Sequence, residues 1–427
     1  MARPAYQPET PSLIHSPSPP ESDLNQADIA GHLAQTADLC VRCGLCLPHC
    51  PTYREARLEA ESPRGRIALI QGWAEGNLDL SPPLLDHLDN CLECLACERA
   101  CPTLVPFGDL MDEARAATWL AAPAWRRALR DAWLAALASR IGTTLAVGFG
   151  RLYRGSGLAR LATWSGIRRW PSLAALHRLV IQFERLPRMA ATQPAQPESG
   201  DRIGLFLGCI ARSAQPGAIE ASVRVLSGFG LEIMVPDDQT CCGALHRHNG
   251  RPEGADRRLT RNALAFTDLT TIGLASACVA ELRVHPGLSA TQDICRFLAD
   301  RDWPERVRLA PLPQRVAVQV PCSQRNRLGN EDAAFALLRR IPAITLVPLP
   351  DNSFCCGAAG TYLLQCPVLS RALLAPKIAS LAALGTPILV TTNTGCALHL
   401  AAGVQEAGLR VEVLHPVELI ARQMHIT

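Results

Sequence analysis

Eight cysteines in two matching runs are the residues of this sequence best suited to do chemistry. The first run reads CVRCGLCLPHCP from Cys40 to Pro51, and the second reads CLECLACERACP from Cys91 to Pro102. Both follow the pattern C-x2-C-x2-C-x3-C-P, which binds cubane [4Fe–4S] clusters. Structural zinc sites typically use pairs of cysteines some way apart, so the spacing favours iron–sulfur clusters over zinc.

Ligation is expected to cross between the two runs. In two-cluster proteins the fourth cysteine of each run ligates the other cluster, because it follows a tighter turn and points away from the first three. One cluster is therefore predicted to be held by Cys40, Cys43, Cys46 and Cys101. The other is predicted to be held by Cys91, Cys94, Cys97 and Cys50.

The composition is that of a multidomain protein from a reducing compartment. A length of 427 residues, 48% of them hydrophobic, suggests about two to four domains. The formal net charge of +3 argues against a dedicated nucleic-acid binder. Residues 1–22 are Pro/Ser-rich without the apolar segment of a signal peptide, so we expect a disordered tail and thiols rather than disulfides among the eighteen cysteines. No uncharged apolar segment of transmembrane length occurs, so no membrane-spanning helix is predicted.

The cysteine runs are expected to lie in a mainly α-helical ferredoxin-type domain over residues 23–112. A short helix over about 24–37 should deliver the first run. Forty residues, Pro51 to Asn90, separate the last cysteine of the first run from the first cysteine of the second, more than a small ferredoxin hairpin needs. Apolar spacing predicts two helices there, over about 66–76 and 82–88.

The sequence Ser62-Pro63 predicts how the longer of these two helices begins. Serine is a favoured N-cap, and proline is favoured at the first helical position. Arg64 and Arg66 could raise cluster potentials by lying near the sulfurs, but solvated side chains at a helix start are the simpler explanation.

Residues 113–200 are predicted to form a helical connector that ends in a linker over 193–200. The segment from 111 to 190 is rich in alanine, leucine and arginine. It holds five of the seven tryptophans, namely Trp119, Trp125, Trp133, Trp164 and Trp170. Amphipathic helices with arginine on one face and tryptophan and leucine on the other can lie in a membrane interface. Helices packed on the neighbouring domains with a solvated basic face are the alternative.

Two similar α/β units are predicted to follow, at residues 201–305 and 313–427. Each starts with a buried strand that ends in a cysteine, then gives a helix, a strand, Cys-Cys-Gly, a helix, a short strand and one more cysteine. Alternating strands and helices with short connections form parallel sheets, and so regular a repeat indicates a duplication. The predicted fold class is therefore α/β multidomain, with an N-terminal mainly α-helical two-cluster ferredoxin domain followed by two duplicated α/β cysteine-rich domains.

Four thiols in each unit are predicted to converge, because ligands gather at the carboxyl ends of parallel strands. The first set is Cys209, Cys241, Cys242 and Cys278, and the second set is Cys322, Cys355, Cys356 and Cys396. Adjacent cysteines do not easily fill two corners of one cubane, so an irregular or shared cluster or a redox-active dithiol is the hypothesis for a further centre. Inert buried thiols are the alternative. Gly243 and Gly357 allow close approach of a ligand or a positive φ.

The remaining cysteines and the nearby histidines have simpler expected roles. Cys295 and Cys366 fall outside the repeated pattern and are predicted to be buried as small apolar side chains. His246, His248 and His399 lie beside the repeated motifs, and structural histidines are expected there rather than ligands.

The chain resembles the iron–sulfur subunit of glycolate oxidase, in the wider family that includes the C subunit of anaerobic glycerol-3-phosphate dehydrogenase and heterodisulfide reductase subunits. The resemblance rests on CVRCGLCLPHCPTY with SPRGRIALI, on CLECLACERACP and on the two CCG repeats, over about residues 35–425. CCG domains of that family often end in C-x2-C. Here Glu281 and His399 stand where the last cysteine of that pattern would be, so a complete non-cubane site is not implied in either unit.

The resemblance implies an electron-transfer subunit with two [4Fe–4S] clusters. Its partners would be FAD-containing flavoprotein subunits that oxidise a 2-hydroxy acid, in the first place glycolate to glyoxylate, with electrons passing toward quinone. A cytoplasmic location with peripheral association with the inner membrane follows, and no nucleic acid is expected as a partner. No G-x-G-x-x-G follows a strand, so no catalytic residue is assigned and the chain alone should be inactive.

Two alternatives stay open at the level of sequence. The chain could be the iron–sulfur subunit of a glycerol-3-phosphate or D-lactate dehydrogenase. It could also belong to a thiol–disulfide reductase of the heterodisulfide type, in which the CCG thiols do the chemistry themselves.

Overall fold

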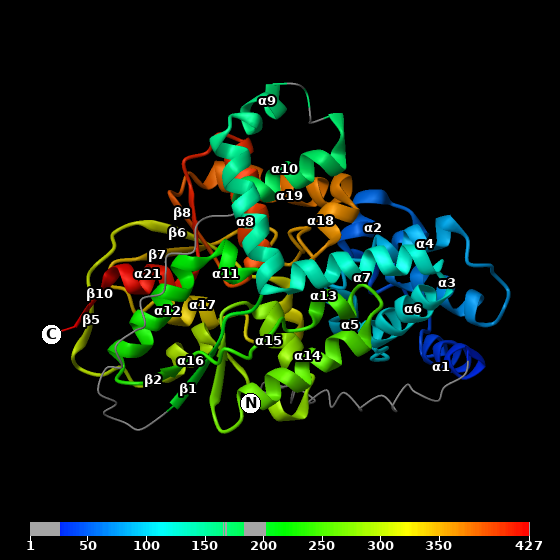
Figure 1. The fold of residues 1–427 in the computed structure, drawn as a ribbon, viewed down its shortest axis with the longest axis horizontal. Coiled ribbons are helices and arrows are strands. Elements are labelled where there is room, and N and C mark those ends of the chain that lie inside the picture. The colour runs from blue at the N-terminus through cyan, green and yellow to red at the C-terminus, as the bar shows by residue number, and fades with distance from the viewer. Residues whose placement is uncertain (1–25, 165, 167–168, 183–201, 427) are drawn as a thin grey trace, which may run out of the picture.

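The computed structural model of the chain describes residues 26–182, apart from 165, 167 and 168, and residues 202–426 (Figure 1). The expected tail over 1–22 and the expected linker over 193–200 lie outside the described residues. Within them the chain forms a helical body, an arm of helices and two α/β units (Figure 1).

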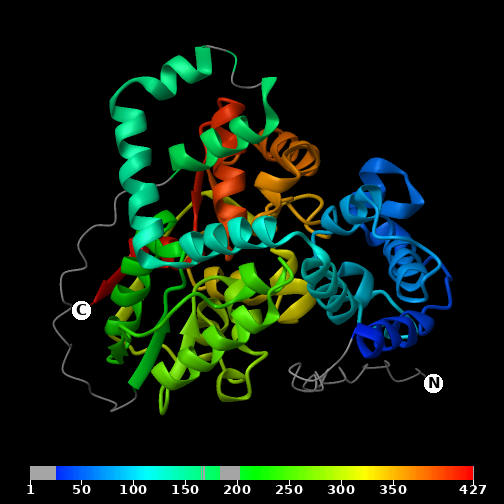
Figure 2. The ribbon, with the colours of Figure 1, turned by 45° about the vertical axis from the view of Figure 1, so that its right-hand side comes forward.

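The helical body carries both cysteine runs and lies at one end of the molecule (Figure 2). Helix α1 packs on α3 and α6, around a core that includes Leu33, Ile70, Leu88 and Met111. The elements of the body are α1 (Gln26–Asp38), η1 (Leu47–His49), α2 (Pro51–Ala56), η2 (Glu59–Glu61), α3 (Pro63–Ala74), α4 (Pro82–Asp89), α5 (Ala96–Arg99) and α6 (Phe107–Ala121).

The helix starts follow the sequence closely, but the domain boundary does not. The Ser62 side chain caps α3 by accepting a hydrogen bond of 2.9 Å from the Gly65 backbone N–H, and Pro63 is the first helical residue, as predicted. The boundary expected at 112 falls inside α6, which supplies Leu110, Met111 and Ala114 to the core of the body. The body therefore continues to the end of α6.

Four helices then form an arm that runs from the helical body across the α/β units (Figure 2). Its elements are α7 (Ala124–Ala138), α8 (Arg140–Gly155), α9 (Leu158–Trp164) and α10 (Pro171–Gln182). Helix α10 packs on α8 and also on α19 and α20 of the second α/β unit, so the arm is tied back at its far end.

The first α/β unit has a parallel sheet of strand order β2-β1-β3-β4. Strand β1 pairs with both β2 and β3, for instance Ile203 with Ile233 and with Thr270. The elements are β1 (Arg202–Phe206), α11 (Ala211–Ala214), α12 (Pro216–Gly228), β2 (Glu232–Met234), α13 (Ala244–Arg247), α14 (Pro252–Ala265), β3 (Thr270–Gly273), α15 (Ser276–Leu282), η4 (Pro286–Leu288), β4 (Gln292–Asp293) and α16 (Ile294–Asp300).

The second unit repeats this topology, with the parallel strand order β7-β6-β8-β9. Its elements are β6 (Arg315–Gln319), η5 (Ser323–Arg327), α17 (Ala333–Leu338), β7 (Thr345–Pro348), α18 (Tyr362–Gln365), α19 (Pro367–Leu384), β8 (Ile388–Thr391), α20 (Thr394–Glu406), β9 (Glu412–Leu414) and α21 (Pro416–Gln423). The two sheets with matching strand orders confirm the predicted fold class.

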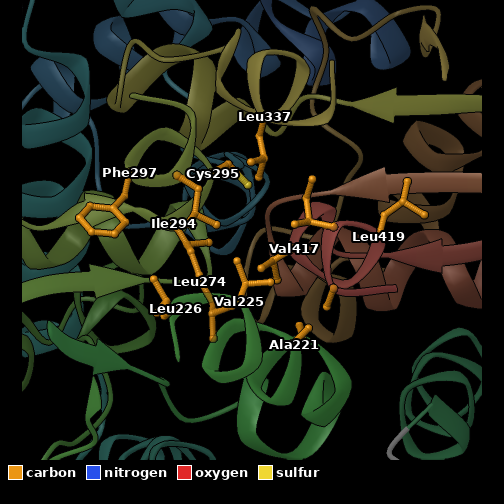
Figure 3. Packing of buried hydrophobic residues seen from close by; sticks show 14 of the residues in the cluster. Ala221, Val225, Leu226, Leu274, Ile294, Cys295, Phe297, Leu337, Val417 and Leu419 are labelled. Atoms are coloured by element: carbon orange, nitrogen blue, oxygen red, sulfur yellow. The ribbon is translucent and has the colours of Figure 1, made fainter. Parts of the chain in front are cut away.

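Helices of the two units pack on each other and join the units. Helix α21 of the second unit packs on α12 of the first, and α16 of the first packs on α17 of the second. Val225, Ile294, Leu337 and Val417 thus meet in one continuous hydrophobic core (Figure 3). Strand β10 (Met424–Ile426) also pairs antiparallel with β5 (Val307–Leu309), which lies between the units in sequence. This shared core fixes the cysteine set of the first α/β unit (Cys209, Cys241, Cys242 and Cys278) relative to that of the second (Cys322, Cys355, Cys356 and Cys396).

Helix α19 is long and apolar enough to cross a membrane by length and composition, and the bent pair α7 and α8 passes the same test together. Helix α19 packs on α18 and α20 within the second unit. It contains the buried Lys377, whose Nζ donates a hydrogen bond of 2.9 Å to the Asp351 carbonyl. These contacts place one side of α19 against the α/β unit.

Candidate metal centres

The first cysteine set surrounds a single cavity in the helical body. Cys40, Cys43, Cys46 and Cys101 all line it, so the fourth cysteine of the second run lies with the first three of the first run. Ile67, Phe107 and Arg64 form other parts of the wall, and Cys97 reaches it from the second run. Cys40, Cys43, Cys46 and Cys101 at one cavity suit a [4Fe–4S] cluster, and the position of Cys101 beside the first run is the one expected from crossed ligation.

The two runs share an unusual backbone shape. Arg42 and Glu93, each just before the second cysteine of its run, have φ of 56° and 48°. Gly44 and Leu95, each just after that cysteine, have φ of 82° and 55°. Left-handed backbone costs a non-glycine residue roughly 1–2 kcal/mol. Its presence at equivalent positions shows that the two runs adopt the same loop shape.

Threonines follow the fourth cysteine of both runs and contact its sulfur. The Thr103 hydroxyl lies 3.4 Å from Cys101 Sγ, and the Thr52 hydroxyl lies 3.2 Å from Cys50 Sγ. Burial acts to raise the pKa of Cys101, but the Thr103 hydroxyl and the backbone N–H groups of residues 103–105 outweigh it and lower that pKa. The repeated Cys-Pro-Thr is the sequence signal for these threonines, although no role was predicted for them.

The second cysteine set is buried in the helical body. Cys50, Cys91 and Cys97 are each at most 8% exposed, and Cys94 lies close enough to Cys50 and Cys91 for their charges to raise its pKa. Burial is the larger cause and raises the pKa of Cys94 and of Cys97 well above the usual value. Burial alone favours the neutral form of these thiols, whereas bound iron would hold them as thiolates. The grouping again fits a cubane cluster.

Arg66 has a different role from the one expected. Its side chain is 1% exposed, and its guanidinium donates to the Glu61 carboxylate at 2.5 Å, the Thr52 hydroxyl at 3.0 Å and the His87 carbonyl at 2.7 Å. The expectation of a solvated helix-start residue is therefore wrong for Arg66, because Glu61 accompanies it into the interior. Arg64 is half-exposed, pairs with Glu59 and lines the first cavity.

The second cysteine set adjoins the CCG thiols of the second α/β unit. Leu92, Cys355 and Tyr362 are buried in one apolar cluster, against which Cys94 and Cys322 pack. The Asn326 side chain donates a hydrogen bond of 2.7 Å to the Cys94 carbonyl and ties the two domains together at this point. Two of the predicted centres are thus neighbours. Tyr362, which no motif marks, lies between them.

The CCG thiols converge within each unit as expected. In the first unit Cys209 Sγ is 3.4 Å from Cys241 Sγ. In the second unit Cys322 Sγ is 3.8 Å from Cys355 Sγ, and Cys356 Sγ is 3.1 Å from Cys396 Sγ. Cys278 and Cys396 belong to the first turns of α15 and α20, just after strands β3 and β8.

The two CCG sets also share their electrostatics. The thiols of Cys209 and Cys242 donate toward Cys241 and lower its pKa well below the usual value. Cys322 and Cys356 do the same to Cys355. Each set thus favours a thiolate at the first cysteine of the pair, which is the form that binds metal or attacks a disulfide.

The glycine after each cysteine pair is required by the backbone. Gly243 has φ of 104° and Gly357 has φ of 89°. A Cβ on Gly357 would lie 2.6 Å from the Ser370 carbonyl oxygen, and one on Gly243 would lie 3.0 Å from Ala255 Cα. The expected positive φ is confirmed at both glycines, and the close neighbour of each is the chain's own backbone.

The histidines near the CCG pairs take structural positions. Burial lowers the pKa of His246 and of His399 to about 4, so both are neutral, and His399 Nε2 lies 3.2 Å from the Ser370 hydroxyl. His248 instead meets Glu93 and Asp112 of the helical body, where Arg115 also pairs with Glu93. This charged network joins the second cysteine run to the first α/β unit.

The two cysteines outside the pattern differ from each other. Cys295 is fully buried in the core shared by the two α/β units, as expected for a small apolar side chain. Cys366 is half-buried beside Tyr362, and its Sγ lies 3.8 Å from the Asp89 carbonyl at the boundary with the helical body.

Comparison with known proteins finds the same arrangement of domains. The family model described as a 4Fe-4S dicluster domain matches residues 36–105, and the one described as a cysteine-rich domain matches 203–280 and 316–401. The glycolate oxidase iron-sulfur subunit of Escherichia coli (strain K12) is 30% identical over 408 residues, which cover 90% of this chain and 93% of that protein. The chain belongs to this family of iron–sulfur subunits. Its N-terminal body is thus a dicluster domain that binds [4Fe–4S] clusters.

Other relatives share all or part of this arrangement. The probable glycolate oxidase iron-sulfur subunit of Bacillus subtilis (strain 168) is 29% identical over 421 residues, 89% of this chain and 92% of that protein. One subunit of the fumarate reductase (CoM/CoB) of Methanothermobacter marburgensis is 29% identical over 227 residues, 52% of this chain and 46% of that protein. The chain is accordingly the iron–sulfur subunit of an oxidoreductase.

Proposed function

We propose that the chain transfers electrons from an FAD-containing flavoprotein toward quinone, in a complex that oxidises a 2-hydroxy acid, with glycolate as the substrate. The main support is the placement of three cysteine sets in series. The first lies near the surface of the helical body, the second is buried next to it, and the CCG set of the second α/β unit adjoins the second. The names of the full-length relatives support glycolate in particular.

In the proposed complex the flavoprotein oxidises the substrate and this chain transfers the electrons, and this assignment accounts for every electron and proton. Oxidation of glycolate to glyoxylate releases two electrons and two protons, and the flavoprotein would carry out this step. A bound [4Fe–4S] cluster supplies one-electron transfer. This chain would then receive the electrons singly, and the protons would be released to solvent on the side of the flavoprotein.

The residues between the second and third sets suit this role. Leu92 and Tyr362 fill the space beside Cys94 and Cys355 and exclude water from it. Asn326 holds the Cys94 loop in place through its hydrogen bond to the Cys94 carbonyl. An apolar contact that is also held by a hydrogen bond keeps redox centres at a short separation, which favours fast electron transfer.

Activity of the isolated chain tests this proposal. Purified alone under anaerobic conditions, the chain should show no glycolate- or lactate-dependent reduction of a dye, since no flavin fingerprint occurs in its sequence. Added to its flavoprotein subunits, it should restore transfer from glycolate to a quinone analogue. Glycolate oxidation by the chain alone, with bound FAD, would contradict the proposal. Restoration with glycerol 3-phosphate or D-lactate but not glycolate would replace only the substrate.

A second candidate function is thiol–disulfide reduction at the CCG sets. The separation of 3.1 Å between Cys356 Sγ and Cys396 Sγ favours it, because two thiols in contact can exchange with a disulfide. Turnover of a disulfide substrate by the chain with reduced dye, in the absence of any flavoprotein, would favour this function over the first.

We further propose that the complex works in the cytoplasm at the inner membrane, with α8 to α10 as the membrane-facing surface. Helix α8 packs through Thr143, Val147 and Gly150, where Gly150 lies against Val180 of α10. The opposite side of the helix, roughly 180° away, carries large apolar side chains that are 62–75% exposed. They are Ile141, Leu145, Phe149 and Leu152. A surface helix of a globular domain normally buries its apolar face, so this orientation supports an external apolar environment.

The rest of the arm continues this apolar surface. Six further exposed side chains follow on α9, on α10 and just before α10, namely Leu158, Leu161, Trp164, Trp170, Leu173 and Leu176. Residues 124–182 contain ten arginines and a single acidic residue, Asp131. Exposed tryptophan and leucine beside arginine suit the interface of an anionic membrane.

Vesicle binding tests the membrane proposal. The complete chain should co-sediment with phosphatidylglycerol vesicles, less so at high salt, because each arginine near an anionic surface contributes about 1 kcal/mol. Leu145→Asp with Phe149→Asp should abolish co-sedimentation, whereas Leu264→Asp, at an equally exposed leucine of α14, should not. Equal sedimentation with phosphatidylcholine and phosphatidylglycerol vesicles, or no effect of the double variant, would contradict the proposal.

A further inference from the structure

The two cysteine runs present the same face in two different environments. Their backbones match at the left-handed positions, so the residue after the first cysteine occupies equivalent places, Val41 in the first run and Leu92 in the second. Both are branched apolar side chains. The residues that cover Leu92 therefore indicate what kind of surface would cover Val41.

Leu92 is covered by a neighbouring redox site of the same chain. It is 7% exposed, and it packs with Cys355 and Tyr362 of the second α/β unit. The second cysteine of its run, Cys94, packs against the same cluster. In the second run this face therefore serves as the contact between two cysteine sets.

The same face of the first run is uncovered within the described residues. Val41 is 64% exposed, and its neighbour Cys43 is exposed as well, although both line the first cavity. Leu45 at 56% and Leu104 at 62% stand beside other residues that line this cavity. We call Val41, Leu45 and Leu104 the rim. Exposed apolar side chains around a thiol cavity cost solvation without benefit unless a partner covers them.

The polar surroundings of the rim fit a protein rather than a lipid surface. Arg42 donates to Gln71, which donates to Asp38, and Arg64 at the cavity wall pairs with Glu59. Charges of both signs around a small apolar centre are the usual composition of a protein–protein interface. The arm, by contrast, has almost no acidic residues.

We propose that the flavin-bearing subunit docks on the rim and delivers its electrons at the Cys43 side of the first cysteine set. The partner would place an apolar side chain on Val41 as Cys355 and Tyr362 are placed on Leu92. This inference rests on the proposed function as an electron-transfer subunit and adds where the partner binds.

Charge substitutions on the rim test the docking site. The complete chain with Val41→Asp, and separately with Leu104→Asp, is mixed with the purified flavoprotein subunits from the same organism. Binding and the rate of cluster bleaching by glycolate-reduced flavoprotein should each fall about tenfold or more, as for a central interface residue. Reduction by dithionite and the EPR spectra should stay as in the wild type. Leu264→Asp, 74% exposed on α14, should change neither binding nor rate.

The outcomes separate the docking site from the function on which it rests. A wild-type chain that the flavoprotein reduces, together with rim variants that bind and are reduced equally well, overturns the docking site alone. A wild-type chain that glycolate-reduced flavoprotein neither binds nor reduces removes the proposed function and the docking site with it. A photo-reactive side chain at position 45 should crosslink to the flavoprotein, and one at position 264 should not. This measurement decides the matter even if both rim variants lose their clusters, because failure to crosslink in an intact complex overturns the proposal.

Discussion

Replacing Cys94 by alanine should abolish electron transfer from glycolate to quinone through this chain, while replacing Cys366 by alanine should leave it close to wild type. Cys94 is one of four thiols in the second set and packs directly against the CCG thiols of the second unit. Its loss removes a ligand of the set that lies between the first cysteine set and the CCG set of the second α/β unit.

Metal analysis separates this effect from unfolding. Iron in the dicluster domain should fall from about eight to about four atoms per chain, since one of two cubanes is lost. The EPR signal of the cluster at Cys40, Cys43, Cys46 and Cys101 should persist. Full transfer activity in Cys94→Ala, with half the iron, would show that the second set is not part of the route.

Cys366 is the matched control for this prediction. It lies in the same apolar cluster beside Tyr362 and is half-buried, like Cys94. It belongs to none of the four four-thiol sets, so Cys366→Ala removes a sulfur of the same size from the same boundary without removing a proposed ligand. Equal loss in both variants would point to disturbed packing between the domains instead of a missing ligand.

The cysteine groupings could be predicted from sequence because cluster ligation is encoded by local spacing. Seven residues place the first three thiols of each run, and the closing proline and the repetition identify the fourth. The two α/β units could also be predicted from the sequence, since a buried strand followed by a cysteine recurs at Cys209 and at Cys322. In both cases the information lies in a short stretch, repeated once.

Whether a side chain is buried depends on contacts with residues distant in sequence, which local sequence patterns do not indicate. Arg66 was expected in solvent, but Glu61 and the His87 carbonyl take up its charge and hydrogen bonds inside the body. Helix α8 has a clear amphipathic pattern, but the sequence does not say that its small-residue side faces the protein. The contact of Leu92 with Tyr362 joins residues 270 positions apart, so no local spacing could indicate it.

The packing of helices between the two units is a feature that the sequence motifs do not indicate. Helix α21 belongs to the second unit in sequence yet packs on α12 of the first. Val417 and Val225 belong to one core, although each looks like an ordinary core residue of its own unit. The duplication was visible in the motifs, whereas the joint core is a property of the assembled pair.

Serine substitutions in the two CCG pairs should have unequal effects. If both sets hold a metal or take part in transfer, Cys241→Ser and Cys355→Ser should each lower glycolate-to-quinone activity and leave the two cubanes intact. We expect the larger loss for Cys355→Ser, because Cys355 adjoins Cys94 and Leu92, whereas Cys241 packs with Phe206 and Phe266 inside the first unit. Both thiols are buried and have a lowered pKa through their neighbours, so their intrinsic chemistry is alike.

The two variants therefore differ in the distance of the replaced cysteine from the second cubane. Turnover should be read together with the EPR signal of the second cubane, which Cys355→Ser should perturb through its proximity to Cys94 and which Cys241→Ser should not. Cys295→Ser, in the shared core and outside both sets, controls for the cost of a buried hydroxyl. Wild-type turnover in both CCG variants would return these cysteines to inert structural thiols. A larger loss for Cys241→Ser would place the exit of the electrons in the first unit, so that the second unit would lie off the route.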